Sequence, residues 1–379
     1  MDFTLDTEQV ALRDAVRSLL TKDYDSSETR RAVVNGEEPG WQAGTWNRLA
    51  DMGVLGLPFA EEDGGMGAGP VEVSIVAEEI GRVLAPEPFI GAIVLAGGLI
   101  STVGTFEQRG ELLSAIAEGT LVPAFAGSEP TGRWSVAASG VTASEDNEQW
   151  TLTGVKEPVL GGARADLLIV SAKVGHGTGL FTVTADAAGL TRDGYKTHDG
   201  GRAARVTFDA TPATPLGEAG ADQTAAIEAA IARAQIAYCH EAVGAMEVAL
   251  DTTSSYLKTR KQFGVTLNKF QALTFRAADM YVSLELAKSM VLWATLVLDA
   301  GEDALEAASR AKLIVSRTGR HIGQEAIQLH GGIGMTAEYS VGHYVSRLTA
   351  IEHTLGDGRH HLAQLAAGIG DHDVVDALR

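Results

Sequence analysis

Two short segments in the second half of the chain carry residue types suited to binding a phosphorylated nucleotide. The first is Arg260–Gly264, which reads RKQFG, and Gln271 follows shortly after it. The second is Gln328–Gly334, which reads QLHGGIG. An arginine presents a planar fork of donors that matches a pyrophosphate, and paired glycines let backbone N–H groups approach a ligand. Such glycines could equally end a helix, so the expectation of a nucleotide site depends on the two segments occurring together.

Composition and charge exclude several classes of function. The 379 residues are 45% hydrophobic and 21% charged, which suits a soluble chain of two or three domains. The net charge of −19, without a basic cluster, argues against nucleic acid as a partner. The single cysteine, Cys239, excludes an internal disulfide and a multi-cysteine metal site, and we expect no metal. The chain opens without a signal-peptide pattern, and its apolar runs are too short to span a bilayer. We therefore expect a cytoplasmic protein with no membrane partner.

The first third of the chain, residues 1–118, reads as a helical domain. Asp6 can cap a helix whose apolar positions recur at helical spacing. Further helices are expected at about 40–53, 69–85 and 88–104. A glycine-rich stretch between two of them could be a plain surface turn.

The rest of the chain predicts a middle β domain followed by long helices. Residues 119–222 show the period-two alternation of strands, punctuated by turn residues. Residues 223–379 are rich in alanine and predict a bundle of four helices, the fourth of which closes the chain. The first three are expected at about 224–260, 267–300 and 303–329. The predicted fold class is α+β, mainly α.

This order of domains, together with the two nucleotide segments, resembles the acyl-CoA dehydrogenase family over essentially the whole chain. The resemblance implies FAD as the cofactor, an acyl-CoA thioester as the substrate and an electron-transfer flavoprotein as a partner. It implies α,β-desaturation, in which a carboxylate removes the α proton and the flavin accepts the β hydride. Matched to the family's motifs, the residues that bind FAD are Arg260, Phe263, Gln271, Gln328, Gly331, Gly332 and Thr354.

The catalytic base is less clearly matched than the cofactor contacts. Glu352 corresponds to the base of many family members, but His353 stands where the motif has a glycine. Glu352 could instead belong to a helix start or pair with Arg347 or Arg359. A second branch of the family places its base on the long helix before Arg260. The matching position there is Ala234, and Glu241 lies seven residues further on, roughly 10 Å along a helix axis.

The β domain departs from the family where flavin-ring contacts are expected. Ser128 and Glu129 survive from one motif, but the glycine-rich half after them is lost. In the second motif, Pro158 stands in place of a tryptophan and Leu160 in place of a threonine or serine. Proline has no N–H and leucine has no donor, so neither can replace the lost hydrogen bonds.

The chain therefore keeps the contacts for the ADP end of FAD and loses many of those for the ring. This pattern resembles one subunit of the heteromeric acyl-CoA dehydrogenases of bacterial steroid and lipid catabolism. In these heterotetramers two unlike, paralogous chains share each flavin. Two alternatives remain open: a homo-oligomeric dehydrogenase that uses Glu352 as its base, and a non-catalytic structural subunit of the same fold.

Overall fold

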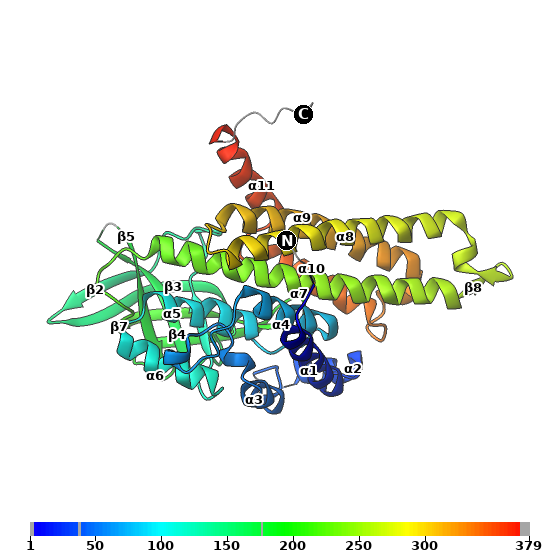
Figure 1. Cartoon of the computed structure of the whole chain (residues 1–379). Helices are drawn as coiled ribbons and strands as arrows, with labels where there is room; N and C mark the ends of the chain where they lie inside the picture. The colour runs from blue at the N-terminus through cyan, green and yellow to red at the C-terminus, as the bar shows by residue number, and fades with distance from the viewer. Residues whose placement is uncertain (1–3, 37–38, 176, 372–379) are drawn as a thin grey trace.

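The computed structural model describes residues 4–36, 39–175 and 177–371. Long helices of the C-terminal region form the long axis of the molecule. The β domain lies toward one end of these helices, and the N-terminal helices pack along one side (Figure 1). The predicted α+β, mainly α architecture of helical, β and helical regions is confirmed.

The N-terminal region contains short helices that begin where the sequence supplies suitable residues. These elements are α1 Thr7–Asp23, α2 Ser27–Asn35, α3 Ala43–Asp51, the 3₁₀ turns η1 Val54–Gly56 and η2 Glu61–Asp63, α4 Pro70–Val83, the π-helical η3 Phe89–Gly97, α5 Gly98–Val103 and α6 Phe106–Ala117. The Asp6 side chain accepts hydrogen bonds from the N–H groups of Glu8 and Gln9, at 2.9 and 2.8 Å, and so caps α1 as predicted. Pro70 takes the first position of α4, where a missing N–H costs little.

The middle region is a seven-stranded sheet that closes on itself. Its strands are β1 Pro123–Ala126, β2 Thr142–Asp146, β3 Gln149–Leu160, β4 Leu167–Val174, β5 Gly177–Thr184, β6 Leu190–Lys196 and β7 Arg202–Pro215. The strand order is β1-β4-β2-β3-β7-β5, β6 pairs with β7, and β4 also pairs with β5. Inward-facing residues such as Leu152, Phe181 and Phe208 form a core of their own.

The C-terminal region is a bundle of long helices with one helix projecting from it. The helices are α7 Thr224–Thr259, α8 Gln271–Asp299, α9 Leu305–His330, α10 Val341–His353 and α11 Gly358–Ala367. A small hairpin, β8 Lys261–Gln262 and β9 Val265–Thr266, joins α7 to α8 at the tip of the bundle (Figure 1). The sequence predicted one closing helix where the structure has α10 and α11. The break follows from Leu355 and Gly356, which adopt positive φ angles of 57° and 112° that a helix cannot contain.

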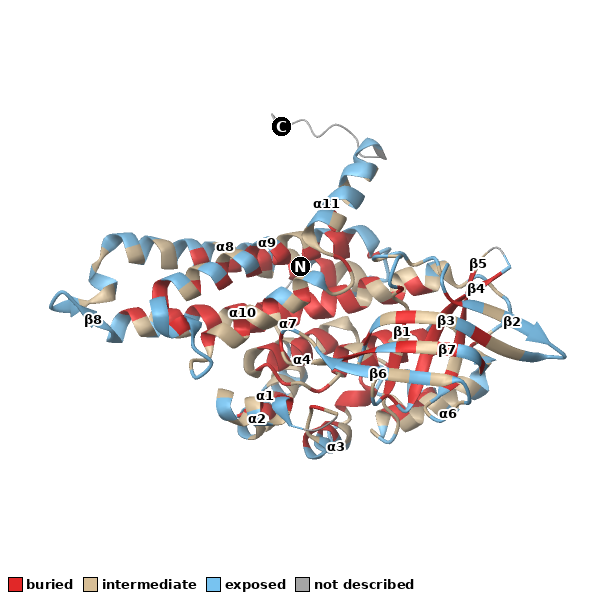
Figure 2. Cartoon of the chain, turned by 180° about the vertical axis from the view of Figure 1, so that it is seen from behind, coloured by how far each residue is buried: buried red, intermediate tan, exposed pale blue. Residues whose placement is uncertain are grey.

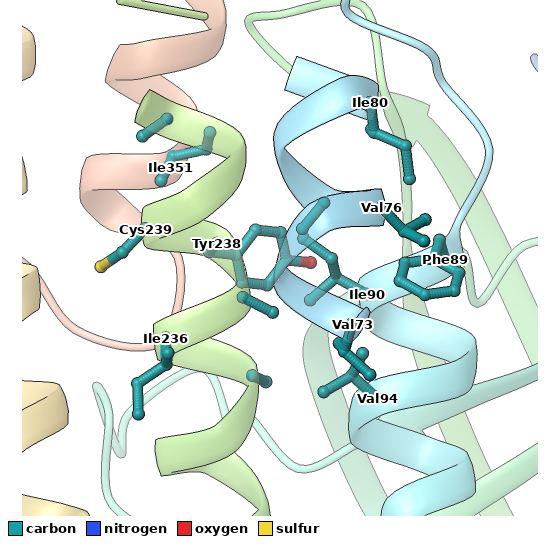
Figure 3. Close-up of a cluster of buried hydrophobic side chains, with 14 of the residues drawn as sticks. Val73, Val76, Ile80, Phe89, Ile90, Val94, Ile236, Tyr238, Cys239 and Ile351 are labelled. Carbon is teal, nitrogen blue, oxygen red and sulfur yellow. The ribbon is translucent and has the colours of Figure 1, made fainter. Parts of the chain in front are cut away.

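Helix α7 is positioned against the N-terminal region by a close crossing with α4. A Cβ atom added at Gly81 would lie 1.9 Å from the Glu241 carbonyl oxygen, and one at Gly244 would lie 2.1 Å from the Glu78 carbonyl oxygen. Glycine at both positions therefore allows the two backbones to touch. Figure 3 shows the apolar cluster beside this crossing, in which Tyr238 of α7 points toward Ile90 of η3.

Helix α8 is long and apolar enough to cross a membrane by length and composition, and among the described residues it is the one helix that passes this test. It packs against α7 and α9 along one face, while much of its other face is exposed (Figure 2). Helix α8 is therefore apolar on its exposed face as well as on the face that packs in the bundle.

Candidate active site

A cavity of about 1330 Å³ lies where the three regions of the chain meet. It is larger than the roughly 300–1,000 Å³ typical of small-molecule sites. Its apolar wall comes from η3, with Ile90, Ala92 and Leu95, and from α7, with Ile231 and Tyr238. Small residues of η3 leave the space open, so the cavity can take a bulky apolar group.

One wall of the cavity carries a charge network centred on Arg347 of α10. Its guanidinium donates to both carboxylate oxygens of Glu241, at 2.6 and 2.9 Å, and to Oδ2 of Asp199 at 2.6 Å. Burial alone would raise the pKa of Asp199, but the charge of Arg347 holds it at about 2. Arg30 of α2 donates to the backbone carbonyl of Asp199 at 3.3 Å. Glu241 therefore joins α7 to α10 through an ion pair and does not stand as a free base.

Neither sequence-predicted position for the base places an unpaired carboxylate in this cavity. Ala234 is fully buried in α7. Glu352 lies in the last turn of α10, where its carboxylate pairs with Arg320 of α9. The neighbours of Glu352 on α10 and after it, among them His353 and Thr354, line the cavity, whereas Glu352 is not among the described lining residues.

Two structural alternatives considered for Glu352 are corrected by these contacts. Glu352 stands near the end of α10 and not at the start of the last helix. Its partner is Arg320, because Arg347 faces the opposite way toward Glu241. The hydroxyl of Thr354 donates to the Ala350 carbonyl of α10 at 2.8 Å, so its hydrogen is already used in a hydrogen bond.

The segments expected at the flavin ring are held together by a buried ion pair. Lys156 donates to Glu129 at 2.8 Å, to Ser171 at 3.0 Å and to the Gly127 carbonyl at 3.0 Å. The N–H of Glu157 also donates to the Ser128 carbonyl at 2.8 Å. The framework of both motifs is therefore intact, although the residues that would contact the ring have changed.

The electrostatics of this pair follow from burial and hydrogen bonding. Burial would raise the pKa of Glu129, but Lys156 and the N–H groups of Gly140 and its neighbours lower it to about 2. Burial lowers the pKa of Lys156, and Glu129 opposes that shift. The pair serves the fold, while Pro158 and Leu160, which follow it, line the cavity without supplying a donor.

A tryptophan occupies the loop in which the family's glycine-rich motif is lost. Trp134 lies in the left-handed region at φ 58° and its ring centroid is 5.3 Å from that of His360 on α11. The guanidinium of Arg133 lies 4.1 Å from the Trp134 ring centroid, a cation–π distance. All three residues line the cavity. The loop is thus built around aromatic packing where the family has small flavin-binding residues.

The residues expected at the ADP end of FAD lie together at the other end of the molecule, on its surface. Arg260 ends α7, Gln271 begins α8, and between them Phe263 stands 91% exposed at the hairpin turn. Gln328 is also exposed, near the end of α9. None of these four is among the described residues that line the cavity.

The paired glycines after α9 are not required by the packing of this chain. A Cβ atom at Gly331 or Gly332 would meet nothing within 4 Å. Gly331 has φ 67° and ends the helix, which explains a glycine there. Gly332 has neither a positive φ nor a close neighbour in the described chain. An approaching ligand or second chain would account for it.

Comparison with known proteins decides the family. The models of the acyl-CoA dehydrogenase N-terminal, middle and C-terminal domains match residues 6–120, 124–211 and 224–370. The chain belongs to the acyl-CoA dehydrogenase family. This is a family of oxidoreductases whose members bind FAD.

Similar proteins align with this acyl-CoA dehydrogenase family member over nearly its full length. The probable acyl-CoA dehydrogenase YngJ of Bacillus subtilis is 27% identical over 382 residues, covering 96% of this chain and 98% of its own. The structure of a variant of the Tcur3481–Tcur3483 steroid ACAD is 34% identical, with a TM-score of 0.88 and coverage of 97% and 99%. The ChsE4–ChsE5 complex from Mycobacterium tuberculosis shares the fold, at 23% identity and a TM-score of 0.89, with coverage of 98% and 100%.

The two halves of an FAD site fit the residues of this chain unequally. At the tip, an exposed arginine, two exposed glutamines and an uncrowded glycine pair provide donors and backbone access for a diphosphate. At the cavity, Pro158 and Leu160 give no hydrogen bonds to a flavin ring. The donor set therefore fits the ADP end of FAD, whereas at the ring Ser128 still lines the cavity but two of the expected side-chain donors are replaced.

Sequence reasoning missed several residues that shape the cavity. Arg347 was considered only as a partner of Glu352, and Asp199 was not considered, because its partner lies 148 residues away. Glu87 was also missed, although its position between two prolines at 86 and 88 marks a fixed segment. Local patterns do not indicate which distant side chains will meet.

Proposed function

We propose that this chain is the non-catalytic subunit of a heteromeric acyl-CoA dehydrogenase. In this role it holds the ADP end of an FAD whose ring is bound by an unlike, homologous chain. The observation that carries the proposal is the separation of the two half-sites. The residues for the ADP end lie exposed at the tip, whereas Pro158 and Leu160 replace two expected donors at the ring side and neither sequence-predicted base position places an unpaired carboxylate in the cavity.

An apolar stripe on α8 supports a protein partner at this face. Phe275, Val282, Leu286 and Trp293 are spaced by seven, four and seven residues, so they share one helix face. They are 58%, 55%, 65% and 39% exposed. Exposed apolar surface of this kind marks protein contacts. The stripe is on the helix that begins at Gln271, so one partner could cover both the stripe and the cofactor residues.

The similar structures support a homologous chain as the partner. Two of them carry paired names, and the ChsE4–ChsE5 structure is described as a complex. A partner related to this chain would supply the carboxylate base and the ring contacts. Bound FAD would accept the β hydride from an acyl-CoA thioester. This chain would contribute Arg260, Phe263, Gln271, Gln328, Gly331 and Gly332. The resemblance to a steroid ACAD makes a steroid-like acyl group the proposed substrate, and an electron-transfer flavoprotein remains the proposed electron acceptor.

Expression with and without a partner tests the proposal. Produced alone, the chain should be colourless. Produced with an acyl-CoA dehydrogenase homologue encoded beside it, it should form a yellow complex that oxidises acyl-CoA. A yellow, active protein from this chain alone would instead support the homo-oligomeric alternative. An active complex that tolerates changes at both Arg260 and Gln328 would support a purely structural subunit.

A further inference from the structure

The corner between α10 and α11 is packed so tightly that its backbone needs outside support. Leu355 and Gly356 take positive φ angles of 57° and 112°. A Cβ atom at Gly356 would lie 2.5 Å from Nε2 of His361, which is fully buried in the first turn of α11. Because α10 stops here, its last backbone carbonyl groups have no hydrogen-bond partner within the helix. A buried carbonyl group needs such a partner, so the corner depends on donors from elsewhere in the chain.

Lys312 of α9 supplies those donors. Its side chain is fully buried, and its ammonium group donates to the carbonyl oxygens of Ile351 at 2.6 Å, Thr354 at 2.8 Å and Glu352 at 3.4 Å. An ammonium group has three N–H donors and no acceptor, so it can serve all three carbonyl groups. Its positive charge also lies at the negative end of the α10 dipole, where a cation is stabilised. Lys312 therefore caps the end of α10 from a neighbouring helix.

Lys312 differs in its partners from Lys156, the other lysine that is buried in the described chain. Lys156 donates to the Glu129 carboxylate at 2.8 Å, whereas no carboxylate of the described residues forms an ion pair with Lys312. Burial lowers the pKa of Lys312 to about 8, so the group still carries its three hydrogens at pH 7. A buried cation is unfavourable unless its hydrogens are paired. The carbonyl groups of the corner meet that need.

The corner connects the packing of the bundle to the wall of the cavity. Gln235 of α7 adds a second donor there, through its Nε2 to the Leu355 carbonyl at 2.6 Å. His353 and Thr354 of the corner line the cavity, and so do residues of α11. Lys312 is not among the described lining residues, so it acts on the cavity through the backbone that it binds. The wall at this corner is thus held by donors from two helices of the bundle.

We propose that Lys312 is a positioning residue of this cavity: its ammonium group holds the end of α10 in place and thereby sets the direction in which α11 leaves the bundle. Helix α11 projects from the body of the molecule (Figure 2). Among its described residues His361 is the buried one, and its Nδ1 lies 3.3 Å from the Ser309 hydroxyl of α9. The corner held by Lys312 and this one contact therefore fix where α11 lies. The inference concerns this chain alone and requires neither a partner chain nor bound flavin.

Hydrogen exchange measured by mass spectrometry on the full-length chain tests the role of Lys312. Lys312→Met keeps the length of the side chain and removes all three donors. Amides of residues 349–362 should then exchange roughly 10- to 100-fold faster, as expected when hydrogen bonds from a charged group are lost. Amides of residues 167–174 in β4 should keep their rate. Unchanged exchange at 349–362 would overturn the proposal.

Two further variants separate local release from general loss of stability. Leu49→Ala is the matched control, because Leu49 is fully buried in α3, is not among the described cavity residues and leaves a void when shortened. It should not accelerate residues 349–362 beyond 167–174; if it does, the corner is merely the weakest part of the fold and the proposal fails. Gln235→Leu removes the second donor and should give a smaller acceleration at the same place. It also carries the test if Lys312→Met does not fold.

Tryptophan emission gives an independent measure of where α11 lies. The Trp134 ring centroid is 5.3 Å from that of His360 on α11, so its emission depends on this helix. Subtracting the spectrum of a Trp134→Phe background isolates that signal from the other tryptophans. Lys312→Met should shift the isolated signal, and Leu49→Ala should leave it as in wild type. A signal that stays unchanged in Lys312→Met would show that α11 keeps its place without the ammonium group, which would reject the positioning role.

Discussion

The cavity and the tip of the bundle differ in what each has kept. The cavity keeps its framework, through Lys156–Glu129 and the Arg347 network, while Pro158 and Leu160 replace two expected ring donors and Glu352 pairs with Arg320. The tip keeps its cofactor residues, while nothing in the chain covers them: Phe263 is 91% exposed. A shape can be maintained by buried contacts within one chain. Binding residues on a surface gain their function from what docks there. In the proposed function, this chain taken alone holds two incomplete half-sites.

The largest effect is expected on the free energy of unfolding, when the buried ion pair between Lys156 and Glu129 is broken. Lys156→Met removes the buried cation and leaves Glu129 without its charge partner. Loss of one partner of a buried pair costs about 3–5 kcal/mol, and the low end is expected here because Glu129 keeps hydrogen bonds from three backbone N–H groups. Urea denaturation measures the free energy of unfolding. The control Lys173→Met, on the exposed side of β4, should change it by less than ~0.5 kcal/mol.

Lowering the pH should remove the stability contributed by the Lys156–Glu129 pair in the unmutated protein. Because the folded-state pKa of Glu129 is about 2 and its ordinary value is 4.5, the stability that it contributes is present above pH 4.5 and is lost as pH falls from there toward 2. In Glu129→Gln this part of the acid sensitivity should be missing. Thermal melting from pH 7 to pH 3 compares the two proteins. Parallel curves for both would show that the pair does not contribute.

Removing the guanidinium of Arg260 should weaken FAD binding and leave the stability of the fold unchanged. Arg260→Ala in the assembled enzyme should cost about 1.5–3 kcal/mol of FAD affinity, since it deletes a charged donor. Flavin retained after gel filtration gives the measurement. Arg233→Ala, on the same helix but hydrogen-bonded to Thr102, should retain FAD as wild type does. Full retention in Arg260→Ala would remove this residue from the proposed site.

Phe263 should contribute to stability only in the complex with a partner chain. As an exposed side chain it should change the stability of the isolated chain by no more than ~0.5 kcal/mol when replaced by alanine. In the FAD-bound complex, Phe263→Ala should lower the melting temperature. Phe106→Ala, which alters another exposed phenylalanine on α6, should be silent in both. Equal melting shifts for Phe263→Ala in the isolated chain and the complex would contradict a role at the interface.

The smallest effect is expected on turnover, when Glu352 is replaced. Since its carboxylate pairs with Arg320, Glu352→Gln should leave turnover of the assembled enzyme within about twofold of wild type, as should Glu325→Gln, which breaks a comparable pair with Arg276. If Glu352 were the base, turnover would fall by roughly 10²–10⁴. Such a fall would restore the homo-oligomeric alternative and break the contrast between the two regions.

The sequence alone determined the order of elements and the residue types that stand at the tip. Apolar periodicity predicted α7, α8 and α9 to within a few residues, and the cap at Asp6 predicted the start of α1. These are local properties, set within a turn or two of the chain. The loss of side-chain donors at Pro158 and Leu160 could also be predicted from the sequence, because the absence of a donor is a property of the residue type.

Only the tertiary structure decided which side chains face one another. Glu352 could point into the cavity or toward α9, and the rotation of α10 about its axis selects Arg320. Arg347 meets Asp199 and Glu241 across 148 and 106 residues. The burial of Glu87 Oε2 without a hydrogen-bond partner among the described residues likewise depends on packing between distant segments. Periodicity marks a buried or exposed face, but the partner across that face is fixed by how the three regions dock.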